Sequence, residues 1–379
     1  MRAPRNLGIT FTVALSVTGL ARAAEVNFAG SVQLDYLFVP TDDSARDFTF
    51  DGFTTELSLK LSADVSEHIA VQVKTCFGCH GFEIGAAYVD FRPASDLTLR
   101  AGRFVPAFGD FQARHDPANH ITSDKPLPYD MGRMLRLREW NMSVLPAPYV
   151  DSGLQASWTP ALSEFVDLEV SAYVVGGLRG NNDATDVDFV QSRSGEAYYV
   201  DNNSRPSVGG RLALRATLGD LLLTAGASIL YGTYDPDNAL DLLILGLDLV
   251  LRVERWTLRA EYLARRTEMA LGDDPSTTFR YGPGADGVFD PYTLKEGFYG
   301  ELAFPLGPLE GVARVDGLRR HGNVALSSEL RSESFVLRYT LGAAINLVRD
   351  WRIKLSGEFY DFSDFADEAG IHLGVVGAF

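Results

Sequence analysis

Residues 241–253 read DLLILGLDLVLRV, and every second position from 243 to 253 is apolar. Asp248 and Arg252 lie between these apolar positions. Because successive side chains of a β-strand point to opposite faces, the stretch predicts a strand with one apolar face. After the two residues 254–255 the alternation resumes over 256–267, so the two stretches predict a hairpin.

The same two-residue period recurs along the whole chain. It predicts sixteen strands, at 26–39, 48–63, 69–75, 83–92, 97–104, 151–158, 165–175, 207–217, 221–233, 240–253, 256–267, 295–304, 309–318, 332–347, 351–362 and 371–379. Short connections alternate with mostly longer ones, an asymmetry typical of outer-membrane barrels. The expected fold is therefore all-β, a sixteen-stranded antiparallel transmembrane β-barrel over 24–379. A soluble periplasmic β-protein is the alternative, but its apolar faces would need partner sheets.

Composition narrows the class of protein further. The 379 residues carry a formal net charge of −16, which argues against nucleic acid as a partner. No Pro/Gly/Ser-rich linker divides the chain, so one domain is expected. No stretch offers eighteen uninterrupted apolar residues, so no transmembrane helix is expected.

Both ends of the chain carry targeting features. Residues 1–23 contain two early arginines, an apolar stretch from Leu7 to Leu20 and the sequence Ala21-Arg22-Ala23, which together predict a signal peptide cleaved after Ala23. The last predicted strand ends in Phe379, and this resembles the C-terminal signal by which outer-membrane proteins are recognised for insertion. The expected location is the bacterial outer membrane, with its lipid as the surrounding partner.

The inward positions of such a barrel would carry more basic than acidic side chains. Rings of basic residues favour anions in a narrow pore, so a weak anion preference is one hypothesis, and mutual pairing of arginines with carboxylates is the other. Sixteen strands enclose an aqueous channel, which the long, charged, proline-rich segment 105–150 would fold inward to constrict. An ordered extracellular cap is the alternative for this segment. The candidate pore-lining residues are Arg100, Arg114, Lys125, Arg133, Arg136 and Arg338.

One hairpin resembles a known family. Residues 88–93, YVDFRP, and 97–109, LTLRAGRFVPAFG, look like the hairpin that leads into the third loop of the phosphate-selective (polyphosphate-selective) porins. The resemblance implies a sixteen-stranded outer-membrane channel that assembles as a homotrimer. The family's phosphate selectivity depends on a lysine-rich constriction, whereas 105–150 contains Lys125 as its only lysine.

The only two cysteines form the motif CFGCH, with Cys76, Cys79 and His80. The motif is typical of covalent attachment of haem c, with His80 as an iron ligand and His115, His120, Met131 or Met134 as candidates for the distal ligand. A Cys76–Cys79 disulfide across a Phe77-Gly78 turn is the other interpretation, because the compartment is oxidising. A zinc site would still lack a fourth ligand.

No catalytic motif accompanies these features: the sequence contains no G-x-S-x-G elbow, H-E-x-x-H helix or Walker phosphate loop. We therefore expect a non-enzymatic outer-membrane porin, a passive diffusion channel for small hydrophilic solutes that include anions. The alternative function is electron transfer at the outer membrane by a barrel that carries haem c.

Overall fold

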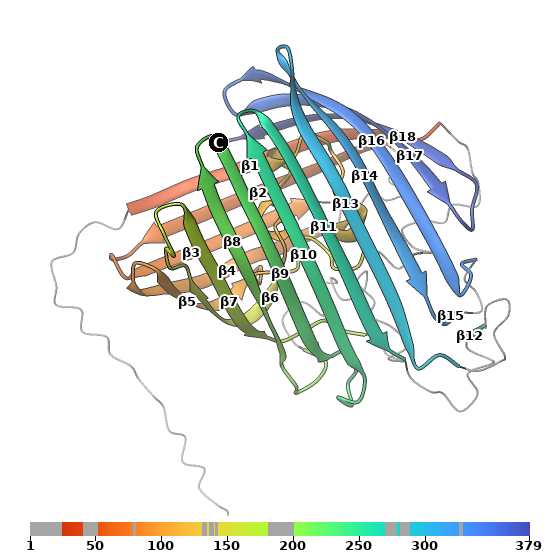
Figure 1. The fold of residues 1–379 in the computed structure, drawn as a ribbon, viewed down its shortest axis with the longest axis horizontal. Helices are drawn as coiled ribbons and strands as arrows, with labels where there is room; N and C mark the ends of the chain where they lie inside the picture. The colour runs from red at the N-terminus through yellow and green to blue at the C-terminus, as the bar shows by residue number, and fades with distance from the viewer. Residues whose placement is uncertain are drawn as a thin grey trace, which may run out of the picture.

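In the computed structural model, sixteen antiparallel strands form one closed barrel (Figure 1). In chain order the strands are β1 (Glu25–Phe38), β2 (Gly52–Asp64), β3 (Ile69–Gly78), β4 (Gly81–Ala94), β5 (Leu97–Phe104), β6 (Asp151–Trp158), β7 (Val166–Val175), β8 (Ser207–Leu218), β9 (Leu221–Thr233), β10 (Asp241–Val253), β11 (Trp256–Glu268), β13 (Tyr292–Leu306), β14 (Leu309–His321), β16 (Glu333–Val348), β17 (Trp351–Phe362) and β18 (Glu368–Ala378). Pairing of β1 with β18 closes the barrel. The two-residue strands β12 (Phe279–Arg280) and β15 (Val324–Ala325) pair only with each other.

The structure describes residues 25–40, 52–78, 81–130, 143–180, 201–269, 279–280, 289–325 and 329–379, together with Leu135 and Trp140. The predicted signal peptide 1–23 lies outside these residues, as do Cys79, His80, Met131, Arg133, Met134 and Arg136. The described helices are three short 3₁₀ turns, η1 (Phe111–Arg114), η2 (Pro117–Asn119) and η3 (Leu127–Tyr129). In this part of the chain, no helix has the length and apolarity that crossing a membrane requires.

The pattern of burial along the strands is the reverse of that in a water-soluble protein: apolar side chains are exposed and charged ones are buried. On β16, Leu341 is 71% exposed, whereas Arg338 is 0% exposed. On β10, Leu245, Leu247 and Leu249 are exposed and Asp248 is buried. An apolar outer band with polar groups inside is stable in lipid, where a closed barrel also satisfies every backbone hydrogen bond. The outer face of the barrel is therefore the lipid-facing one.

The two ends of the barrel differ. Connections 95–96, 219–220, 254–255, 307–308 and 349–350 each have two residues and lie at one end, while the connection 105–150 leaves from the other (Figure 1). The predicted barrel of sixteen strands is confirmed, and four predicted ranges, 97–104, 151–158, 221–233 and 351–362, coincide with the strands formed. β13 and β18 begin three residues earlier than predicted, because their hydrogen-bonded ladders continue beyond the apolar alternation.

The wall is uneven in height. β5 and β6 have eight residues each, whereas β13 has 15 and β16 has 16. In the order of strands around the barrel, the short pair lies opposite β14 and β16. A tilted strand needs about 9–11 residues to span a membrane, so the short side falls below that length.

Candidate functional site

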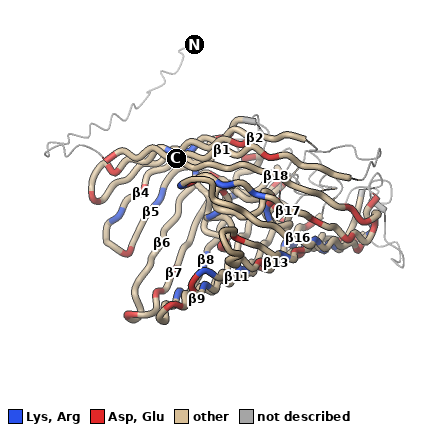
Figure 2. The backbone as a smooth tube through the Cα atoms, turned by 90° about the horizontal axis from the view of Figure 1, so that it is seen from above, with Lys and Arg blue, Asp and Glu red and all other residues tan. Residues whose placement is uncertain are grey.

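Charged residues occur along the strands as well as at their ends (Figure 2). Near the short connections, several inward positions carry exposed charges, namely Lys60 on β2, Asp167 on β7, Arg215 on β8 and Arg252 on β10. The side chain of Arg215 is 55% exposed. This end of the lumen is therefore open to water.

On five neighbouring strands of the wall, inward charges are buried. The relative exposure is at most 2% for five basic residues on β11, β13, β14, β16 and β17: Arg265, Lys295, Arg314, Arg338 and Lys354. Their partners come largely from residues 105–150, which we call the loop segment. Because these wall positions alternate with lipid-facing ones, the described part of the loop segment packs against the inner wall.

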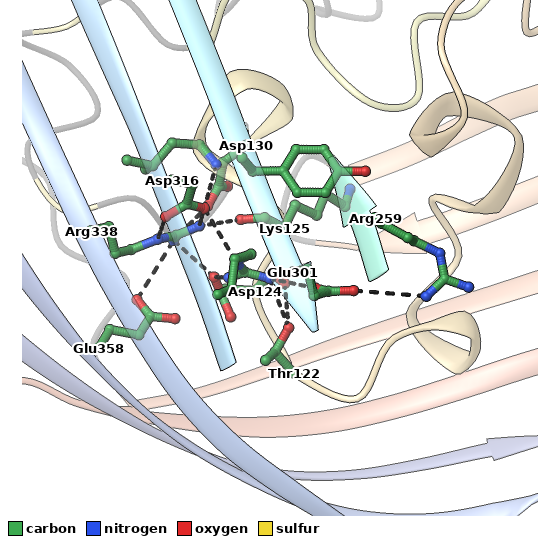
Figure 3. Close-up of polar contacts among 12 residues, drawn as sticks. Thr122, Asp124, Lys125, Asp130, Arg259, Glu301, Asp316, Arg338 and Glu358 are labelled. Carbon is green, nitrogen blue, oxygen red and sulfur yellow. Dashed lines mark hydrogen bonds and ion pairs between the residues drawn. The ribbon is translucent and has the colours of Figure 1, made fainter. Parts of the chain in front are cut away.

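One attachment, a cluster of buried ion pairs, joins the loop segment to β14 and β16 (Figure 3). Nη1 of Arg338 lies 2.8 Å from Oδ2 of Asp124, and Arg314 forms a second ion pair with the same oxygen. Arg338 also donates Nη2 to Oδ2 of Asp316 at 2.6 Å, and that oxygen accepts the backbone N–H of Leu127 at 2.9 Å. Arg338, Asp124 and Asp316 have fully buried side chains. Removing one member would leave the remaining buried charges out of balance, which is unfavourable in a low-dielectric interior.

A second attachment is centred on Glu261 of β11. Its carboxylate accepts the hydroxyls of Tyr129 at 2.5 Å and Tyr299 at 2.6 Å. It also accepts the backbone N–H groups of Phe111 at 2.8 Å and Asp110 at 3.2 Å. These four donors match the acceptor capacity of an ionised carboxylate, so Glu261 binds η1 and η3 together.

Three further wall residues donate to main-chain carbonyls of the loop segment. Lys354 donates to Pro117 at 2.6 Å and to Thr122 at 3.2 Å. Lys295 donates to Trp140 at 2.5 Å, and Arg265 to Val144 at 3.3 Å. The loop segment is thus attached at several separate points along its length.

Between its attachments to Glu261 and Lys354, the loop segment carries partly exposed charges. We call Asp110, Arg114, His115 and Asp116 the rim; their side chains are 26%, 15%, 12% and 34% exposed. Arg114 bonds Asp110 at 2.7 Å, and Arg259 of β11 lies 3.8 Å from the same carboxylate. At the other end of the rim, Asp116 pairs with Lys74 of β3.

The predicted pore-lining residues take different places. Arg114 lies in the rim, while Arg100 forms a bidentate pair with Asp90 on the wall, at 2.8 and 2.9 Å. Lys125 donates Nζ to the carbonyl of Ala147 at 2.7 Å. Arg338 has no exposed surface, so it attaches the loop segment and does not line open space. Arg133 and Arg136 lie outside the described residues.

The cysteine hairpin differs from the predicted geometry. Phe77 pairs with Phe82 and Gly78 with Gly81, so only Cys79 and His80 separate β3 from β4. The expected turn at Phe77-Gly78 is wrong, because the strands continue through a Phe77–Phe82 contact with ring centroids 4.9 Å apart. Glu83 lies opposite Cys76, which is a half-buried free thiol on the inward face. Cys79 and His80, the other two residues of the motif, lie outside the described residues.

The sequence pattern predicts that several of these wall residues lie inside the barrel, but it does not predict that they bind the loop segment. Glu261, Arg314 and Lys354 turn out to hold the loop segment. Lys74 was not singled out, although it occupies an inward position on β3 and pairs with the rim. The two-residue alternation does place these residues on the inner face. It does not show which residue of the loop segment each one contacts.

The likeness of the chain to known proteins is one of fold. No family model matches the sequence, and neither does any curated protein. Among solved structures, an anion-selective porin from Comamonas acidovorans is 13% identical, with a TM-score of 0.56 over 94% of this chain and 100% of that chain. The outer-membrane channel DcaP of Acinetobacter baumannii is also 13% identical, with a TM-score of 0.54 over 94% and 97%. OmpF of Salmonella typhi is 12% identical, with a TM-score of 0.56 over 94% and 98%.

The fold is that of bacterial outer-membrane porins. Together with the apolar outer face, this architecture makes the chain an outer-membrane β-barrel.

Proposed function

We propose that the protein is a porin, a passive diffusion channel for small hydrophilic solutes. The observation that carries the proposal is the water-open lumen, where Arg215 keeps 55% of its side chain exposed on the inner face of β8. A barrel built only for anchorage has no need of exposed charge inside its wall. Solutes would pass from the long-loop end to the short-turn end without any chemical step.

The loop segment is the proposed constriction. Its attachments to Glu261, Asp316, Arg338 and Lys354 support this role, because they hold it against the inner wall. The rim is then the part of the constriction that solutes meet. Short, buried ion pairs would keep that edge in one position while solutes pass.

The preference among solutes follows from the charges at the rim. Arg114, Arg259 and Lys74 stand against Asp110, Asp116 and Glu301, with contacts of 2.7 Å between Arg114 and Asp110 and 4.0 Å between Arg259 and Glu301. Because each positive charge lies close to a negative one, their effects on a passing ion largely cancel. The proposed preference between anions and cations is therefore small at neutral pH. The likeness of 88–109 to phosphate-selective porins supports a place among anion-conducting channels, and Lys125 as the sole lysine of the loop segment argues for solutes broader than phosphate.

Association as a homotrimer is the second part of the proposal. The eight-residue strands β5 and β6 are too short to span the bilayer unaided, so protein is expected to cover them. OmpT of Vibrio cholerae, a 10% identical structure with a TM-score of 0.52, is described in a trimer form. Packing of three copies through β5 and β6 would leave the tall strands facing lipid.

Planar-bilayer recording of the purified, refolded protein tests the channel. Stepwise conductance increases and swelling of liposomes in small sugars are expected. A folded, heat-modifiable barrel that produces no conductance steps would contradict the proposal. Gly357→Ala serves as a control for the effect of substitution itself, because an added Cβ there meets no atom within 4 Å. Its conductance should equal that of the wild type.

A further inference from the structure

On the outer face of β11, β13, β14 and β16, the charged side chains all lie near the long-loop end of the barrel. Arg319 of β14 lies opposite Glu296 of β13 and forms an ion pair with Glu333 of β16. The other arginine on this face, Arg266 of β11, pairs with Glu268 at 3.3 Å. Glu296, Arg319 and Glu333, which we call the outer triad, therefore form a row in which one positive charge lies between two negative ones.

The rest of this outer face, toward the middle of the membrane, carries no charge. Tyr262 of β11 lies opposite Phe298 of β13. Gly317 of β14 lies opposite Leu337 of β16. The hydroxyl of Tyr262 donates to Glu296 of the outer triad. Because aromatic residues form girdles at the lipid–water boundaries of outer-membrane barrels, the outer triad lies at the level of the lipid headgroups.

A groove of about 290 Å³ lies at this boundary. Its lining includes the apolar side chains of Phe298, Phe335 and Leu337, and it also includes Arg319 and Glu296. An empty groove would forfeit dispersion contacts, and apolar walls offer water no hydrogen-bonding partners. In a membrane, an acyl chain of a lipid is therefore expected to fill it. The headgroup of that lipid would then lie against the outer triad.

The outer triad indicates which headgroup fits. Among the described residues, the only hydrogen bond of the Arg319 side chain runs from Nη2 to Glu333, and this side chain is 60% exposed. Its other donors are available to a phosphate, whose oxygens match the guanidinium fork. A phosphate alone would meet a carboxylate on each side of Arg319. An amine on the same headgroup would instead pair with Glu296 or Glu333, because an ionised carboxylate can accept several hydrogen bonds.

We infer that the groove and the outer triad bind one membrane lipid whose headgroup carries both a phosphate and an amine. The acyl chain occupies the groove, the phosphate binds Arg319, and the amine binds the carboxylates of the outer triad. The proposed trimer, packed through β5 and β6, leaves this site facing lipid. Because the site is on the outer face, the inference does not depend on conduction through the lumen.

Native mass spectrometry of the full chain, purified in a maltoside detergent, tests the inference with three lipids that share their acyl chains. Dimyristoyl phosphatidylethanolamine offers a phosphate and an amine that donates hydrogen bonds. Dimyristoyl phosphatidylcholine offers the phosphate without N–H donors, and dimyristoyl glycerol offers neither group. One phosphatidylethanolamine per chain should bind about tenfold more tightly than dimyristoyl glycerol, the effect of one charge-assisted hydrogen bond, and phosphatidylcholine should fall between them.

Two pairs of variants separate the headgroup from the acyl chain. Arg319→Gln should weaken phosphatidylethanolamine binding about tenfold and leave dimyristoyl glycerol unchanged. Arg349→Gln, which changes a 95% exposed arginine at the short-turn end, should behave as the wild type. Leu337→Trp places a larger side chain in the groove and should weaken binding of all three lipids. Leu341→Trp makes the same change on β16 outside the groove lining and should not.

The inference is overturned if the three lipids bind alike, or if Arg319→Gln keeps the wild-type preference. Displacement of phosphatidylethanolamine by inorganic phosphate would also overturn it, because the site would then be one for a free anion. If the wild type binds no lipid and Leu337→Trp dissociates an oligomer, the groove is an interface between copies of the chain. Heat-modifiable mobility shows that each barrel has formed, and separate conductance recordings distinguish a failure here from a failure of the channel function.

Discussion

Asp124 of the loop segment and Arg338 of β16 are both completely buried, and Oδ2 of Asp124 lies 2.8 Å from Nη1 of Arg338. The same carboxylate also pairs with Arg314, so one residue of the loop segment neutralises two guanidinium groups of the wall. Asp124 therefore links the loop segment to two strands of the wall at once.

Asp124→Asn is expected to weaken that attachment by at most about 3–5 kcal/mol, the usual cost of removing one partner from a buried ion pair. The loss stays below that limit because Arg338 still pairs with Asp316 at 2.6 Å and Arg314 with Glu301 at 3.4 Å. Trp140 of the loop segment, 1% exposed, reports the change through acrylamide quenching, and single-channel recordings should become noisy. Glu333→Gln removes an ion pair with Arg319 whose side chains are 56% and 60% exposed, and should cost less than about 1 kcal/mol. Equal quenching in both variants would contradict this role for Asp124.

Gly109 marks the point where the loop segment meets Glu261. Its φ is +60°, and a Cβ there would lie 2.3 Å from Oε2 of Glu261 and 2.5 Å from the hydroxyl oxygen of Tyr129. Gly109→Ala is therefore expected to displace two hydrogen-bonding partners, at a cost of about 1–3 kcal/mol beyond the backbone strain.

Gly307→Ala provides the matched control, because its φ is also +60° and no atom lies within 4 Å of the added Cβ. It should cost only about 1–2 kcal/mol, the strain of a left-handed residue. Chemical unfolding and channel noise measure the difference. Identical behaviour of the two variants would show that contact with Glu261 has no part in the effect.

The sequence predicted the strands well and the attachments poorly, for one physical reason. A strand between lipid and water needs an apolar residue at every second position, so 241–253 and 351–362 are visible locally. The partner of a buried charge is not a local property. Arg338 was expected to line the pore, because the two-residue alternation places it on the inner face. The alternation does not indicate that Arg338 forms a buried ion pair with Asp124. The turn of the cysteine hairpin was misplaced because a cross-strand Phe77–Phe82 contact extends the ladder.

Visible absorption and thiol reactivity distinguish the interpretations of the cysteine motif. Because Cys76 lies within the β3–β4 ladder, opposite Glu83 and half-buried beside Lys74, we expect its thiol to be unavailable for haem attachment. The protein should then have no visible absorption, even when it is expressed with cytochrome c maturation machinery. Cys76 should react slowly with a small water-soluble maleimide in the absence of reductant, and Cys76→Ser should abolish that reaction. Sharp reduced bands that survive denaturation would establish haem c, and reaction only after reduction would establish a disulfide.

The short strands β5 and β6 lead to a prediction about assembly. Leu154 of β6 is 62% exposed on the outer face, at the side where the wall is lowest. Leu154→Arg is expected to convert the proposed trimer to a monomer in detergent, because a charge cannot be buried unpaired in an apolar interface.

Leu341→Arg places the same charge on β16, at 71% exposure and on the opposite side of the barrel. It should lower barrel stability by up to about 2–4 kcal/mol, as an arginine on a lipid-facing position does, while the protein remains trimeric. Light scattering coupled to size exclusion distinguishes the two results. The interface lies elsewhere if Leu154→Arg stays trimeric, and on the tall side if only Leu341→Arg dissociates. Leu154 and Leu341 are similarly exposed but lie on strands of eight and 16 residues. A difference between the two variants therefore depends on strand length and not on hydrophobicity.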